Sequence, residues 1–138
     1  MVLLGLLLVS LNQCRKDNKS VPSVKTNPVT NLSITKATCG GYLIDDGGDK
    51  ISARGICFSK NGSPTISDSV IYSSETVIFM VTVTGLQAGT KYYVRAFATN
   101  GHGTGYGNTV EFVTSLPASY LILPTIFQSA FISNYGTA

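Results

Sequence analysis

Glycine stands at every second position from 101 to 107, and this segment also holds the only histidine of the chain, His102. Glycine-rich loops cradle phosphates when a strand precedes them and a helix N-terminus follows, because the helix supplies convergent N–H groups. Here the strand-like residues TVEFVTS follow the loop, and no Lys-Ser/Thr pair closes it. A hairpin between two strands explains the glycines better, since glycine permits positive φ and tight turns.

The residues of this segment do not form a set of catalytic groups for acid–base or nucleophilic chemistry. His102 is expected at a loop tip, and no nucleophile motif accompanies it. The DDGGD segment (Asp45, Asp46, Asp49) offers oxygen ligands of the kind that calcium prefers. Three carboxylates without a longer ligand series favour a polar turn between strands instead. The sequence therefore predicts no catalytic residue, no metal site and no cofactor.

The three cysteines predict two kinds of chemistry. Cys39 and Cys57 fall in neighbouring strand-like segments, so in an exported chain they are candidates for a disulfide, the alternative being two buried thiols. Cys-x-x-Cys metal spacing is absent. Cys14 follows an apolar run, Val2 to Leu11, which is too short to span a bilayer core of about 30 Å. The run has the length of a secretory signal core.

The remaining composition predicts an all-β domain. Charged residues make up only 12% of the chain, while the branched and aromatic residues that suit a pleated surface are abundant. Strand-like runs alternate with turn residues at the spacing typical of a sandwich. We predict seven short strands packed as two sheets, preceded by a helical signal segment. The net charge of +3 lies mainly near the N-terminus, which argues against binding to nucleic acid.

The segment KYYVRAFATN, residues 91–100, sorts into two faces. Tyr92, Val94, Ala96 and Ala98 share one face, and their small and branched side chains would let an opposing sheet approach. The other face mixes aromatic residues with Arg95, whose stem can lie across them while its charge stays hydrated. The first face is therefore predicted to be buried.

The segment LQAGTKY, residues 86–92, resembles the Leu-x-Pro-x-Thr-x-Tyr pattern of fibronectin type III domains, with Ala88 in place of the proline. Together with ATCGG, DDGG, SARGICFS, PTISDS, GTGYGN and VEFVTS, it resembles a fibronectin-type-III-like module that recurs in surface lipoproteins of Bacteroidetes. The resemblance covers about residues 21–115. It implies an immunoglobulin-like β-sandwich that is extracellular and non-catalytic. It also implies a structural tyrosine corner, in which the Tyr92 hydroxyl bonds to backbone a few residues upstream.

Two further resemblances concern export. The box Leu11-Asn12-Gln13-Cys14, followed by charged residues, resembles a bacterial lipoprotein signal, although small residues are usual in place of Asn12 and Gln13. It implies a lipidated Cys14 and an outer-membrane lipoprotein facing the periplasm or the cell surface, held by a lipid anchor; a plain cleaved signal is the alternative. The tripeptide DSV at 68–70 resembles the O-glycosylation acceptor of exported Bacteroidetes proteins, so Ser69 is a candidate glycan site.

These observations divide the chain into four parts. Residues 1–14 form the signal peptide, 15–22 a polar tether, 23–115 the sandwich, and 116–138 a linker. In the last part, LPTIFQSAFI aligns with VPSVKTNPVT at an offset of 102 residues, which suggests the truncated start of a second repeat. A disordered apolar tail is the alternative.

The function predicted from these parts is spacing or adhesion by a lipid-anchored, monomeric surface module. Protein or glycan ligands would contact the loops at 45–50 and 100–107, where His102 and Tyr106 are the candidate contacts. The alternative is an accessory carbohydrate- or protein-binding domain of a larger polysaccharide-degrading enzyme.

Overall fold

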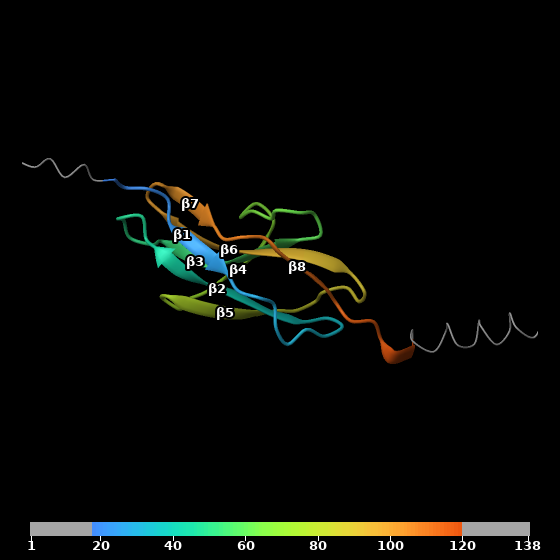
Figure 1. The fold of residues 1–138 in the computed structure, drawn as a ribbon. Coiled ribbons are helices and arrows are strands. Elements are labelled where there is room, and N and C mark those ends of the chain that lie inside the picture. The colour runs from blue at the N-terminus through green and yellow to red at the C-terminus, as the bar shows by residue number, and fades with distance from the viewer. Residues whose placement is uncertain (1–17, 120–138) are drawn as a thin grey trace, which may run out of the picture.

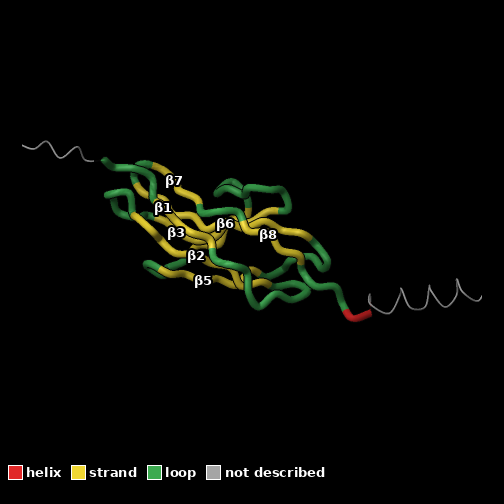
Figure 2. Tube along the Cα trace, viewed as in Figure 1, coloured by secondary structure: helices red, strands yellow, loops and turns green. Residues whose placement is uncertain are grey.

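A computed structural model describes residues 18–119, which form two antiparallel sheets packed face to face (Figures 1 and 2). The eight strands are β1 (Ser23–Thr26), β2 (Ala37–Asp45), β3 (Ala53–Ser59), β4 (Ser69–Tyr72), β5 (Ile78–Val83), β6 (Lys91–Asn100), β7 (Gly103–Tyr106) and β8 (Val110–Val113). The smaller sheet has the order β1-β2-β5, and the larger has β4-β3-β6-β7, with β8 also pairing with β6. The predicted all-β sandwich is confirmed. The predicted signal helix lies outside the described residues.

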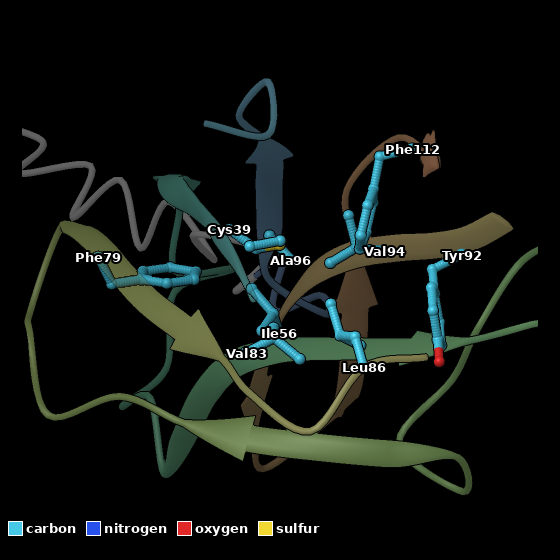
Figure 3. Packing of buried hydrophobic residues seen from close by; sticks show 10 residues of the cluster. Cys39, Ile56, Phe79, Val83, Leu86, Tyr92, Val94, Ala96 and Phe112 are labelled. Carbon is cyan, nitrogen blue, oxygen red and sulfur yellow. The ribbon is translucent and has the colours of Figure 1, made fainter. Parts of the chain in front are cut away.

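The core lies between the sheets, and β6 contributes the face that its alternation predicts. Tyr92, Val94, Ala96 and Ala98 are all buried. Phe79 and Val83 of β5, Cys39 of β2 and Ile56 of β3 meet this face (Figure 3). Inward residues at every second position of β5 and β6 therefore supply half of the buried cluster, because side chains alternate across a strand.

The predicted seven strands become eight because the last one is interrupted. β7 and β8 both pair with β6, but between them only the Gly107 N–H, which donates to the Ala96 carbonyl at 2.8 Å, still bonds to the backbone of β6. There the Gly107 carbonyl accepts a hydrogen bond from Arg95 Nε, and Asn108 Oδ1 accepts one from the Thr26 backbone N–H. The first predicted strand is also shorter than expected, because β1 ends at Thr26. Further along, Thr30 pairs with Thr38 as an isolated bridge.

On one long side of the sandwich, β1 lies beside β7, and glycines let the two segments approach closely. A Cβ at Gly105 would lie 1.7 Å from the Pro22 carbonyl oxygen, and one at Gly107 would lie 2.4 Å from Thr26 Oγ1. The Thr26 hydroxyl in turn accepts a hydrogen bond from the Ala96 N–H at 3.0 Å, joining the two sheets. Among the four glycines from 101 to 107, only Gly103 at the start of β7, with φ of 134°, uses a backbone conformation that side chains disfavour. Thus Gly105 and Gly107 serve close packing more than turning.

The described chain enters and leaves the sandwich at opposite ends (Figure 1). Residues 18–22 approach at the end where β6 finishes, and the chain departs after β8 at the end where β6 begins. Within residues 18–119, no helix is both long and apolar enough to cross a membrane.

Candidate functional site

The end where the chain enters, here named the tether end, is organised by Asn100. Its side-chain Nδ2 donates to the Ser20 carbonyl at 2.7 Å and to the Asp46 carbonyl at 2.8 Å. Its Oδ1 accepts from the His102 N–H at 2.8 Å. The Ser20 N–H also donates to the Gly47 carbonyl at 2.9 Å. One buried side chain therefore joins the end of the tether, the loop at 45–50 and the β6–β7 turn.

The carboxylates of this end hold the turn that the sequence predicted. Asp45 and Asp46 each accept a hydrogen bond from a backbone N–H two residues later, at Gly47 and Gly48. Asp49 Oδ2 lies 3.6 Å from Nε2 of His102, and both side chains are partly exposed. The two loops predicted to carry ligand contacts thus lie together, beside the tether. Among residues 18–119, no group of three or more possible metal ligands is present.

At the opposite end, a pocket of about 700 Å³ opens beside β4 and the loop after β5. Its lining combines two aromatic rings, several hydroxyl groups and one charge of each sign, and consists of Phe58, Ser59, Lys60, Ser67, Asp68, Ser69, Thr84, Gly85, Leu86 and Tyr92. Asp68 Oδ2 accepts from the Thr65 N–H at 2.8 Å, which holds one wall in place. The lining could accept an uncharged polar ligand with an apolar face, because aromatic and hydroxyl groups converge there.

Tyr92 lines this pocket and fastens the loop between β5 and β6. Its ring is buried and stacks on Phe112 at a centroid distance of 5.8 Å. Its hydroxyl accepts a hydrogen bond from the Gln87 backbone N–H at 3.0 Å. This is the upstream backbone bond that the sequence resemblance implies for the tyrosine corner. Lys60 Nζ donates to the Gln87 side chain at the pocket rim.

The predicted disulfide between Cys39 and Cys57 is wrong, since both are free thiols. Cys39 points between the sheets into the core, whereas Cys57 contacts the Pro64 and Arg95 carbonyls at 3.4 and 3.6 Å. Its neighbour Ile56 faces the core, so Cys57 lies on the outer face of the larger sheet. Burial raises the pKa of Cys39 to about 12 and that of Cys57 to about 11, with the Arg95 charge lowering the latter in part. The alternative of two buried thiols therefore holds.

The other predicted contacts occupy different surroundings. Tyr106 was expected on a loop but is the last residue of β7, where Arg95 lies 4.6 Å from its ring centroid. Its hydroxyl accepts a hydrogen bond from the Ile66 N–H, so it supports the 60–68 connection. His102 does lie in the turn and is exposed. Ser69 is exposed at the first residue of β4, and its glycosylation stays a prediction. Cys14 lies outside the described residues.

Two features were missed from the sequence. Asn100 continues the buried register of residues 92, 94, 96 and 98, so a polar side chain at that position had to find partners inside. The spacing of two residues along this strand was therefore enough to predict that Asn100 is buried. The pocket had no comparable signal, because its lining comes from four separate segments whose proximity depends on the sheet order.

No family model matches the chain, and no curated protein does. Among solved structures, it is similar to the sensor domain of the anti-sigma factor RsgI4 from Pseudobacteroides cellulosolvens, with 14% identity over 71% of this chain and 98% of that one, at a TM-score of 0.52. A redesigned β-sandwich protein is 23% identical over 71% and 93%, with a TM-score of 0.50. A myokine is 20% identical over 70% and 97%, also at 0.50. These similarities show the fold, a fibronectin-type-III-like sandwich.

Proposed function

We propose that this chain is a non-catalytic extracellular spacer, held on the outer membrane by a lipid on Cys14, that carries an adhesive surface away from the membrane. The observation that supports it best is that the described chain enters and leaves the sandwich at opposite ends. Strand β6 alone has 10 residues and runs between these ends. At about 3.3 Å per residue, it spans about 33 Å.

The tether end supports an upright orientation. Ser20 is fastened by Asn100 and Gly47, and the six residue steps between Cys14 and Ser20 reach at most about 20 Å. A lipid on Cys14 would therefore keep the tether end close to the bilayer. The loop at 45–50 and His102 would face the membrane, and an adhesive contact would lie at the pocket end or on the sides.

The chemistry of the described residues supports a non-catalytic role. The three aspartates of DDGGD accept hydrogen bonds from nearby backbone N–H groups. The thiols of Cys39 and Cys57 are buried with raised pKa values, whereas nucleophilic thiols have depressed ones. His102 has a carboxylate neighbour but contacts no hydroxyl or thiol nucleophile within residues 18–119.

The test measures the height of each end above the membrane. The full chain is produced in an exporting host with Lys50→Cys at the tether end or Ala88→Cys at the other end, and each thiol is labelled with a fluorophore. Energy transfer to a dye in the bilayer should be strong for Lys50→Cys and should correspond to a position about 30 Å farther out for Ala88→Cys. Equal transfer from both would contradict the spacer.

The anchor is tested separately by intact mass. The membrane-extracted chain should carry a diacyl- or triacylglyceryl increment that disappears in a Cys14→Ala variant. An unmodified mass in the soluble fraction would overturn the anchor, while leaving the fold and the pocket untouched.

The pocket supports a second candidate function, that of an accessory binding domain within a larger polysaccharide-degrading enzyme. The two aromatic residues and the hydroxyl groups of its lining suit a sugar ring, which has one apolar face. Soluble xylan and β-glucan oligosaccharides should then shift the NMR signals of residues 84–86, and a Thr84→Trp variant that fills the pocket should abolish the shifts. Shifts that persist in this variant, or shifts of the 45–50 loop instead, would exclude the pocket as the site.

A further inference from the structure

Strand β5 is an edge of the smaller sheet, and one row of its backbone groups has no partner strand within residues 18–119. The Leu43 N–H donates to the Val77 carbonyl, and the register continues along β2 and β5. Backbone groups alternate in direction along an antiparallel pair. The odd-numbered residues of β5 therefore bond to β2, and Ile78, Met80 and Thr82 direct their N–H and C=O groups outward. We name these three residues the β5 edge.

The β5 edge lacks the devices that usually block strand pairing. Edge strands are ordinarily protected by charged side chains, proline or a bulge. No charged residue and no proline occurs from residue 76 to 90, and the β2–β5 register is continuous. The outward side chains are apolar and open, with Ile78 65% and Met80 53% exposed. Tyr42 and Ile44 on the adjoining strand extend the same apolar face.

We propose that the β5 edge pairs with the β5 edge of a second copy of this chain, antiparallel about a two-fold axis at Met80. This departs from the monomeric module expected from the sequence. With Met80 opposite Met80 of the partner subunit, Ile78 lies opposite Thr82 of the partner subunit, and all outward groups of the β5 edge are paired. An axis at Phe79 or Val81 would pair only two of these three residues with each other, because Thr82 or Ile78 would then lie opposite position 76 or 84, outside β5.

The chemistry of the strand favours a second copy over another occupant. A two-fold interface brings identical surfaces together, so a charged strand would repel itself. β5 carries no charge, and its Met80 and Ile78 side chains would lie beside the same apolar side chains on the β5 edge of the second copy. The two smaller sheets then form one continuous sheet of six strands, since each contributes three.

Disulfide trapping tests the register in the full membrane-extracted chain. Paired residues of this type have Cα atoms about 5.5 Å apart, which lies within the range of disulfides. Met80→Cys should therefore form a crosslinked dimer on non-reducing gels. The matched control is Thr82→Cys, whose two copies would be four residues out of register, about 13 Å apart, and should not crosslink. Joining Ile78→Cys to Thr82→Cys in one chain should restore the crosslink. Equal crosslinking by both single variants would overturn the register.

A charge on the axis tests the pairing itself. Met80→Lys should convert the dimer to a monomer in sedimentation or light scattering, because two cations would meet at the axis. Ser23→Lys adds the same charge to β1, at the far edge of the same sheet, and should leave the dimer intact. Circular dichroism checks that both variants fold. A parent chain that is monomeric at all concentrations, or a dimer that Met80→Lys leaves unchanged, would overturn the proposal. So would slow hydrogen exchange at the β5 edge in a monomer, which would show that the chain covers this edge itself.

Discussion

The two long sides of the sandwich differ in whether contacts between the two sheets close them. On the β1 side, the backbone at Pro22 presses against Gly105, and the Thr26 hydroxyl bonds across to β6. On the β5 side, no strand and no cross-sheet hydrogen bond closes the edge within the described residues. The closed side depends on glycines that remove side chains, and the open side exposes apolar side chains. The comparison teaches that the residues of each outer strand decide whether its edge is closed. Glycines let β1 pack against β7, whereas the exposed apolar residues of β5 leave its backbone groups free to pair with another strand.

The largest effect should come from removing an inward side chain of β5, and the outward neighbour serves as its control. Phe79 is 1% exposed and Met80 is 53% exposed, although they are adjacent in β5. Phe79→Ala should lower the free energy of unfolding by about 3–5 kcal/mol, because it leaves a cavity between the sheets. Met80→Ala should change it by no more than about 0.5 kcal/mol. Urea unfolding at constant m-value measures both, and equal losses would mean that β5 faces the wrong way.

The closed side should break when glycine gains a side chain. Gly105→Ala places its Cβ against the Pro22 carbonyl oxygen, so the two backbones must separate. A loss of about 1–3 kcal/mol is expected. Gly62→Ala is the control, since nothing lies within 4 Å of its Cβ and its φ is not positive. It should leave stability unchanged or raise it by about 0.4–1 kcal/mol. Similar losses in both variants would refute close approach as the role of Gly105.

The tether end of the closed side should loosen when Asn100 is removed. Asn100→Ala deletes two donors and one acceptor inside the structure, which should cost about 1–3 kcal/mol. Trypsin should then cut after Lys19 faster, because Ser20 is no longer held. His102→Ala removes only a partly exposed contact at 3.6 Å between Nε2 and the Asp49 carboxylate, and its effect should stay below about 1 kcal/mol. Unchanged cleavage in Asn100→Ala would show that the Gly47 contact alone holds the tether.

The sequence predicted the features that depend on alternation and local turns. The buried face of β6, the turn at 45–50 and the β6–β7 hairpin follow from residue spacing alone. It did not reveal whether Cys39 and Cys57 face each other, because a change of one position in strand register moves a side chain to the other face. Tyr106 was placed on a loop because glycines surround it, but Gly105 and Gly107 belong to the contact with β1. Such close approach between segments distant in sequence has no local signature.

The smallest of these effects tests how the open side is held at its pocket end. The Tyr92 hydroxyl accepts a hydrogen bond from the Gln87 N–H, and this bond fastens the loop that leads from β5 to β6. Tyr92→Phe keeps the ring stacked on Phe112 but leaves that N–H without its partner, so a loss of about 1 kcal/mol is expected. Hydrogen exchange at Gln87 should quicken while exchange at Phe79 stays slow, because the loop opens without the core. Tyr93→Phe is the control, since no hydrogen bond of the Tyr93 hydroxyl is found within residues 18–119. Quickened exchange along all of β5 in Tyr92→Phe would mean that the corner holds the whole open side and not the loop alone.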